Sequence, residues 1–332
     1  MISPAQSYLD FLRLAFSRQT RALVYDTPQA SGVTPLEPGR ANVISELLLR
    51  QYGQDHQAEL QAHGSDIRHW LARLEVLLRE DLADYLGPVA EAVLADVAVG
   101  LMPHMASNAF AMQVPGQSDA HVIGVNLGLV WVCDYLCEAL LRAADGDESG
   151  GQTAYVLANK MYLAQHQRQI DEAMAVSDRL KDDETSVRAG AVGSLVLRFV
   201  ALHELGHVVH GHVGKAGMAL SMATGKLEYV RGDSLGAAAV HAMEYEADEF
   251  AVECLLARTS GPTVMWNNML FIGAFFRLLA RIELERGQPL CPHHPAPLDR
   301  LEKIHDQVVR SIGPPPNDAW QWAIQKQNEW SL

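Results

Sequence analysis

The sequence predicts an α+β fold that is mostly helical and contains one small antiparallel sheet. Over much of the chain, apolar residues recur three and four positions apart, as they do between Leu71 and Leu82, and this spacing is typical of one face of a helix. Residues 107–126 break the pattern, because two short strand-like runs there flank a turn at 116–119. Two downstream segments, 194–212 and 243–256, are predicted to be helices that carry histidines and acidic residues.

Three regions are expected along the chain. Residues 1–95 are predicted to be a helical region, interrupted by a loop rich in proline and glycine at 31–40. Residues 96–312 contain the predicted strands and the two helices with histidines and acids, and they form the main domain. Residues 313–332 form a C-terminal tail. Three tryptophans in this tail are expected to dock on the body of the protein: Trp320, Trp322 and Trp330.

The composition is that of an ordinary globular protein and excludes some classes of partner. Of the 332 residues, 48% are hydrophobic and 20% are charged. The net charge of −14 argues against a nucleic-acid partner held through its phosphates. Four cysteines are too few for a disulfide framework in a chain of this length, so we expect reduced thiols and a cytoplasmic protein.

No integral membrane segment is expected. The N-terminus lacks a basic start followed by an apolar stretch, so no signal peptide is predicted. No apolar run reaches the roughly 20 residues that cross a bilayer without interruption. The closest run, Val264–Leu279, contains Asn267, Asn268 and Arg277 and is predicted to be a buried core helix.

The strongest motif is His203-Glu204-Leu205-Gly206-His207, which has the form H-E-x-x-H. Two histidines four apart lie on the same face of a helix, so both imidazoles can reach one metal ion. Glu204 lies about 100° further round the axis, where its carboxylate can hold a water molecule. The apolar run at 194–202 favours a buried helix over a solvated charged face. The motif therefore predicts a site for one Zn²⁺ per chain.

A third ligand is predicted in the helix at 243–256. An alternative pattern, with a further histidine after the motif, fails because Val213 stands where that histidine would be. Glu244 and Asp248 share the apolar face of the helix, where an unpaired charge is costly. We assign Glu244 to the zinc and Asp248 to the free N–H of a ligand histidine, with an internal salt bridge to an arginine as the alternative. Three acids lie on the opposite, solvated face: Glu246, Glu249 and Glu253.

Other segments have structural explanations beside functional ones. Cys133 and Cys137 are four apart, so they can face a second metal, although small buried residues are the commoner role. Acidic residues at 145–151 suggest calcium, but the glutamate that closes a calcium loop is missing, and an exposed loop is predicted. The glycine-rich segment 214–237 is either a lid over the site or a plain loop.

Five ordered elements between residues 100 and 305 resemble the HtpX-like and CAAX-prenyl-protease family of zinc metallopeptidases. The elements are Asn108–Ala111, His121–Leu129, His203–His207, Glu244–Asp248 and His294-Pro295 with Arg300. Members of that family carry transmembrane helices, which are not expected in this chain. A weaker resemblance is to the phage-exclusion Lit-type peptidases, a soluble group with a similar zinc motif.

The resemblance implies a zincin-like core of the gluzincin type. It implies zinc ligands at His203, His207 and Glu244, Glu204 as the catalytic base, and Asp248 as the acid behind the ligands. It also implies that His294 and Arg300 lie near the active site. The strand formed by His121, Val122, Ile123, Gly124, Val125 and Asn126 resembles the sheet edge that pairs with an extended substrate.

The expected function is that of a zinc endopeptidase acting on a protein or peptide, with Glu204 as general base. His294 is the first candidate to stabilise the oxyanion and Arg300 the second. The alternatives are a structural role for His294 and a pairing of Arg300 with Asp248. His210 is one turn further along the ligand face and can reach the cleft, whereas His212 is expected to be structural. Two other functions stay open: a zinc amidase acting on a small molecule, and a non-catalytic protein that binds through the cleft.

Overall fold

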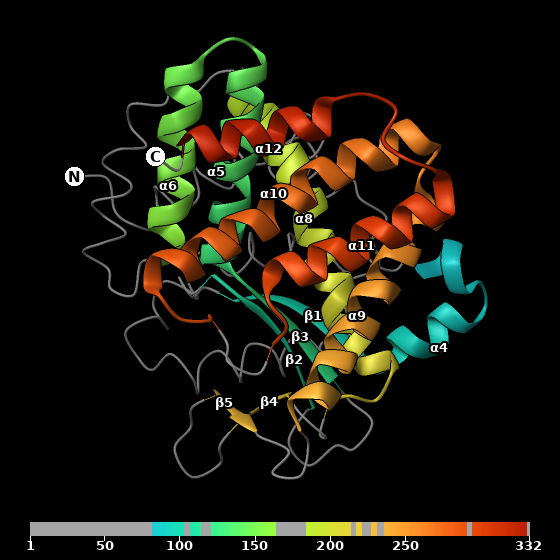
Figure 1. Cartoon of the computed structure of the whole chain (residues 1–332). Coiled ribbons are helices and arrows are strands. Elements are labelled where there is room, and N and C mark those ends of the chain that lie inside the picture. The colour runs from blue at the N-terminus through green and yellow to red at the C-terminus, as the bar shows by residue number, and fades with distance from the viewer. Residues whose placement is uncertain are drawn as a thin grey trace, which may run out of the picture.

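The computed structural model describes residues 82–102, 107–113, 121–163, 184–213, 217–220, 227–230, 236–290 and 294–330 (Figure 1). The helices predicted at 5–18 and 41–50 and the loop at 31–40 lie outside the described residues.

Helices make up most of the described chain, which confirms the predicted α+β class. The helices are α4 (Val89–Ala95), α5 (Leu127–Ala144), α6 (Glu148–Leu163), α8 (Glu184–Val209), α9 (Ala237–Arg258), α10 (Pro262–Arg286), α11 (Pro297–Ile312) and α12 (Ala319–Trp330). The strands are β1 (Val97–Met102), β2 (Ala109–Gln113), β3 (His121–Asn126), β4 (Gly217–Leu220) and β5 (Leu227–Val230). The three-stranded sheet lies at one end of the helical body (Figure 1).

The main sheet differs from the prediction in one strand. Its order is β1-β3-β2, with β2 antiparallel and β1 parallel to β3. No strand was predicted at β1, because a short apolar run has no period that separates a buried strand from a buried helix. The predicted antiparallel pair, β2 with β3, is present, and the parallel strand β1 makes the sheet mixed.

Strand β3 is the centre of this sheet rather than its edge. It pairs with β1 from Val97↔His121 to Met102↔Asn126 and with β2 from Ala109↔Val125 to Gln113↔His121. The prediction that the strand His121–Asn126 is a sheet edge that pairs with substrate is thus wrong, because both sides of this strand already have partners. Among the described strands, β2 is the edge on the side of α8.

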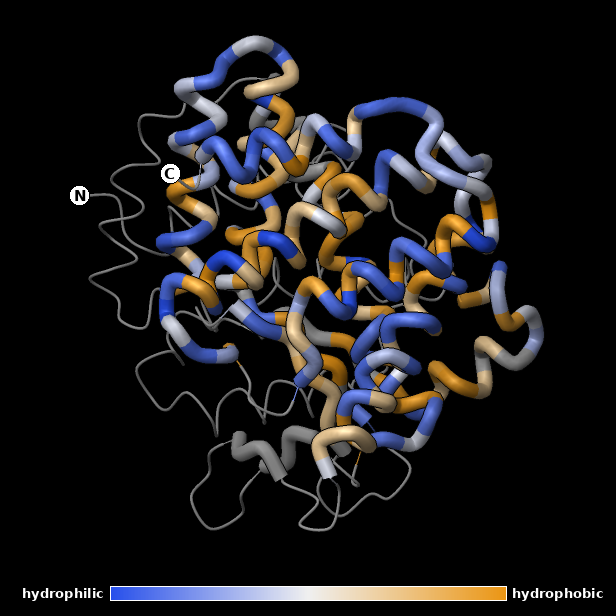
Figure 2. The backbone as a smooth tube through the Cα atoms, viewed as in Figure 1, coloured by the Kyte–Doolittle hydropathy of each residue, from blue (hydrophilic) through white to orange (hydrophobic). Residues whose placement is uncertain are grey.

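Helix α8 passes through the middle of the molecule. It packs against α5, α9 and α10 and against strands β2 and β3. Because other elements surround it, α8 buries apolar residues all round its axis rather than along one stripe, and the apolar flank of the motif has this cause. Figure 2 shows hydrophobic residues concentrated where the helices meet. The buried apolar residues of α8 include Val196, Leu197, Phe199, Ala201, Leu202 and Leu205.

Among the described residues, two helices are long and apolar enough to cross a membrane by length and composition alone. They are α10 and the part of α8 from Val192 to Val209. Of these stretches, 50% and 56% respectively are buried inside the protein, and buried core helices pass the same test. For α10 this agrees with the predicted core helix.

Helix α6 begins inside the segment predicted to be an exposed loop. The carboxylate of Asp147 accepts the backbone N–H of Gly150 at 2.9 Å and so caps the first turn. Its other oxygen lies 3.2 Å from Nη1 of Arg142. Both oxygens of Asp147 therefore have protein partners at the start of a helix, and residues 148–151 are helical rather than a loop.

The C-terminal tail docks on the body, as predicted. Helix α12 packs against α6 and α10. The ring of Trp330 is buried and lies 5.5 Å from the ring of Tyr155. A Cβ atom at Gly273 would lie 2.4 Å from the Trp320 ring, so the absent side chain makes room for the indole. The tail is thus part of the folded domain.

Candidate metal centre

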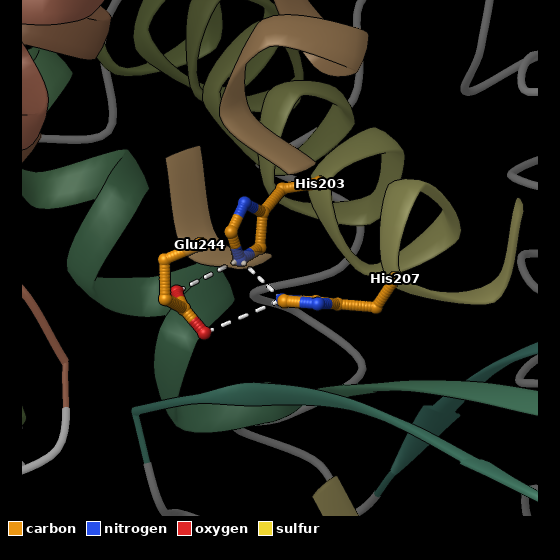
Figure 3. A group of neighbouring side chains, drawn as sticks. All are labelled: His203, His207 and Glu244. Carbon is orange, nitrogen blue, oxygen red and sulfur yellow. Dashed lines mark hydrogen bonds and ion pairs between the residues drawn. The ribbon is translucent and has the colours of Figure 1, made fainter. Parts of the chain in front are cut away.

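Three predicted ligands meet where the end of α8 approaches the start of α9. His203 and His207 project from successive turns of α8, and Glu244 projects toward them from α9 (Figure 3). The two Nε2 atoms lie 3.1 Å apart. Nε2 of His203 is 3.4 Å from Oε2 of Glu244, and Nε2 of His207 is 3.4 Å from Oε1.

These separations suit a tetrahedral zinc ion. Ligand atoms about 2.0–2.1 Å from a tetrahedral zinc lie about 3.3 Å from one another. The two Nε2 atoms lie 3.1 Å apart, and each lies 3.4 Å from a different oxygen of Glu244, so the three residues are close enough to hold one ion between them. Three protein ligands leave a fourth position open, which is the arrangement of catalytic rather than structural zinc sites.

The outer contacts of the two histidines fix which nitrogen carries the proton. Nδ1 of His203 lies 2.9 Å from Oδ1 of Asp248, an acceptor, so this nitrogen carries the hydrogen. Nη2 of Arg300 is 3.3 Å from the same nitrogen, but it donates to Asp248 at the shorter distance of 2.7 Å. Nδ1 of His207 lies 3.1 Å from Nδ1 of His212. If His207 also carries its hydrogen on Nδ1, the two Nε2 lone pairs face each other.

The charges and lone pairs of Glu244, His203 and His207 favour a cation between them. Oε2 of Glu244 is buried and, among the described residues, accepts no hydrogen bond of normal geometry. Burial raises the pKa of Glu244, but the neighbouring imidazoles of His203 and His207 and the charge of Arg300 outweigh burial and hold that pKa well below its ordinary value. Burial and Arg300 lower the pKa of His203, but the opposite effect of Asp248 and Glu244 is larger. The net result is a pKa raised to about 9. The site therefore attracts positive charge, and its donor set fits zinc.

Arg300 forms a buried network with the two inward-facing acids. Its Nε and Nη2 donate to the two carboxylate oxygens of Asp248 at 2.8 and 2.7 Å, a bidentate pair. Its Nη1 lies 3.2 Å from Oε2 of Glu244. Burial raises the pKa of Asp248, but Arg300 and His203 lower it below its ordinary value. Asp248 thus contacts both a ligand histidine and an arginine, so both of the partners considered for it are present.

Gly206 sets the distance between α8 and α9, the two helices that carry the candidate ligands. A Cβ atom at this position would lie 2.9 Å from the backbone Cα of Ala247, which cannot move without α9. Ala247 is three residues after Glu244, so the same contact determines how closely Glu244 approaches the histidines. The glycine of the motif is therefore required by helix packing.

The change Gly206→Ala should weaken both metal binding and folding. The added methyl group would push α9 away from α8 and move Glu244 from the two histidines. We expect a loss of about 1–3 kcal/mol in the free energy of unfolding, the usual range for overpacking, and a lower zinc affinity. Urea unfolding and chelator competition would measure the two effects. Gly236→Ala, at an open position before α9, is the control, and equal effects of the two changes would contradict the packing argument.

A cleft of about 360 Å³ opens beside the three ligands. Glu204 lies in its wall next to His203 and His207, while the face of α10 and the edge strand β2 provide apolar walls. The arrangement brings a carboxylate, a metal site and a substrate-sized space together. The other lining residues are Asn108, Ala109, Phe110, Ala111, Tyr162, Val213, Val240, Met243, Glu244, Phe276, Leu279, Glu283, Leu290, His294, Pro295, Pro297 and Arg300.

The remaining candidate residues lie at different distances from the ligands. His294 lines the cleft, and its Nε2 is 3.7 Å from Oε1 of Glu244. His210 is exposed and packs against Phe250 and His212. His212 was expected to be only structural, yet it contacts a ligand histidine. The glycine before it, Gly211, was the sequence signal that could have revealed this position.

Cys133 and Cys137 are buried thiols. They agree with the commoner role of small core residues rather than with a second metal site. Burial raises the pKa of Cys133 and of Cys137 well above the ordinary value.

Comparison with known proteins identifies a family. The family model named Peptidase U49 matches residues 152–320, which include helices α8 and α9 and the segment from His294 to Arg300. No curated protein and no solved structure matches the chain. The match supports a peptidase but does not extend to the HtpX-like and CAAX-prenyl-protease assignment suggested by the sequence. Because it covers half of the chain, the chain belongs to the Peptidase U49 family.

Proposed function

We propose that this peptidase is a zinc-dependent endopeptidase that holds one zinc ion per chain. One observation carries the proposal: the Nε2 atoms of His203 and His207 and the carboxylate of Glu244 lie close enough together to hold one metal ion, with Glu204 beside them in a cleft. A purely structural zinc site would need four ligands and no such base. The retained Glu204 therefore favours catalysis over a binding-only role.

In the proposed mechanism, Glu204 moves the proton. When bound, a zinc ion would polarise the scissile carbonyl and lower the pKa of a water molecule. The Glu204 carboxylate accepts the proton of the attacking water and later donates it to the departing amine nitrogen. His294 is the first candidate to donate a hydrogen bond to the oxyanion, because it lines the cleft. Arg300 is second, since its Nε and Nη2 already donate to Asp248.

The proposed substrate is an extended segment of a protein or peptide. Within the described residues, strand β2 forms hydrogen bonds to β3 on one side and lines the cleft with Asn108–Ala111. An extended peptide can add to such an edge through main-chain hydrogen bonds. The hairpin β4–β5 lies near β2 and belongs to the segment that was predicted to be a lid or a loop. Its position beside β2 suits an element that contacts the substrate.

Cleavage of a peptide mixture tests the proposal against the amidase alternative. We expect the purified protein to cleave internal bonds in a mixture of random peptides, to lose this activity with a zinc chelator and to regain it when zinc is added. Mass spectrometry of the products measures all three. Hydrolysis of small amides without any peptide cleavage would favour the amidase. The absence of both would favour a binding protein. The buried thiols of Cys133 and Cys137 agree with the cytoplasmic location that we also propose.

A further inference from the structure

The turn that ends α8 brings a third histidine to the metal centre. Gly211 has φ of +64°, in the left-handed region that glycine favours. The N–H of Gly211 donates to the carbonyl of Val208 at 3.0 Å, and the N–H of His212 donates to the carbonyl of His207 at 2.8 Å. These two bonds define a Schellman motif, in which the side chains of the positions held here by His212 and His207 commonly touch.

His212 bridges the ligand His207 and an acid on α9. Its Nδ1 lies 3.1 Å from Nδ1 of His207, and its Nε2 lies 3.0 Å from Oε2 of Glu246. The side chain of His212 is 5% exposed, whereas that of Glu246 is 55% exposed. Glu246 was expected to belong only to the solvated face of α9. Its carboxylate instead contacts the buried side chain of His212.

The order of donors and acceptors along this chain has one consistent solution. The carboxylate of Glu246 can only accept, so Nε2 of His212 carries a hydrogen. In the neutral ring, Nδ1 of His212 is then an acceptor, and Nδ1 of His207 must donate to it. Nε2 of His207 is left with a free lone pair, and that nitrogen points at Nε2 of His203 and at Glu244.

We propose that His212 and Glu246 are positioning residues that hold His207 in its metal-binding tautomer and orientation. The inference rests on the proposed function, because it assumes that His207 binds zinc. Outer partners of this kind commonly change metal affinity by about 10–100-fold when they are removed. Asp248 positions His203 in the same way. The Nδ1 hydrogen of His203 is thus accepted by a carboxylate, and that of His207 by the imidazole of His212.

Zinc affinity, measured by chelator competition on the full chain, tests the pair. His212→Leu should weaken zinc binding about 10–100-fold. His212→Asn, whose Oδ1 can accept from His207, should restore most of that loss. Glu246→Leu should weaken binding several-fold and Glu246→Gln, which still accepts, should not. Glu249→Leu is the matched control, since Glu249 is an exposed acid on the same helix. Thermal unfolding of each metal-free variant separates lost affinity from lost folding.

The outcomes separate this inference from the proposed function. Weak binding by His212→Leu with recovery in His212→Asn supports the positioning role. If the wild type binds zinc and both His212→Leu and Glu246→Leu bind it equally well, the positioning role is overturned and the zinc enzyme stands. Equal losses in the Leu and Asn variants, together with lower thermal stability, would show a structural cap only. A wild type that binds no zinc would overturn the proposed function and this inference together.

Discussion

Replacement of Glu204 by glutamine should lower the rate of peptide cleavage by at least about a hundredfold, because general-base catalysis contributes about 10²–10⁴-fold. Glutamine has nearly the same shape but cannot accept the proton of the attacking water. The proposed zinc ligands His203, His207 and Glu244 are unchanged, so the variant should keep its metal. Cleavage of a peptide found in the mixture assay and metal content measured on the same sample would test both parts.

Glu249→Gln is the control for this change, since it removes an exposed acid of α9. It should leave cleavage at the wild-type rate. Glu204→Gln with full activity and bound zinc would show that another group takes the proton. Glu204→Gln without zinc would show that the carboxylate holds the metal instead of acting as the base.

Breaking the pair between Asp248 and Arg300 should destabilise the protein by about 3–5 kcal/mol, the range for removing one partner of a buried ion pair. In Asp248→Leu, the guanidinium loses its bidentate partner and His203 loses the acceptor for its Nδ1 hydrogen. In Arg300→Leu, two buried carboxylates lose their cation. Urea unfolding of the metal-free protein would measure both changes.

The double variant shows whether the effect belongs to the pair. Asp248→Leu with Arg300→Leu should be less destabilised than the sum of the single changes, by about 0.5–3 kcal/mol. The surface pair of Asp84 and Arg258, 3.0 Å apart and partly exposed, is the comparison. Asp84→Asn should change stability by less than about 1 kcal/mol. Strict additivity in the buried pair would contradict the network described for the site.

The sequence was sufficient to predict which residues of the two helices come together. Helical periodicity is a local property, so spacing alone put His203 and His207 on one face and separated Glu244 and Asp248 from Glu246. The structure brings the first four into one cluster. Long helices with buried faces are the elements for which such arguments are strongest.

The errors arose where the structure depends on contacts distant in sequence. Strand β1 is an apolar run that pairs with β3 across more than twenty residues, and nothing within the run marks it as a strand. Because β1 pairs with the free side of β3, β3 is central, and the edge that remains beside the cleft is β2. The direction of His212 was missed for a different reason: Gly211 turns the backbone after the helix, so helical phase no longer applies to the residue that follows.

The metal content of the wild type and of two variants tests the central claim most directly. Elemental analysis would be made on protein purified without a chelator, as wild type, Glu244→Ala and Glu249→Ala. We predict near one zinc per chain in the wild type and in Glu249→Ala, and little or none in Glu244→Ala. A folded wild type without zinc, or a Glu244→Ala variant that keeps its zinc in full, would contradict the assignment of this centre.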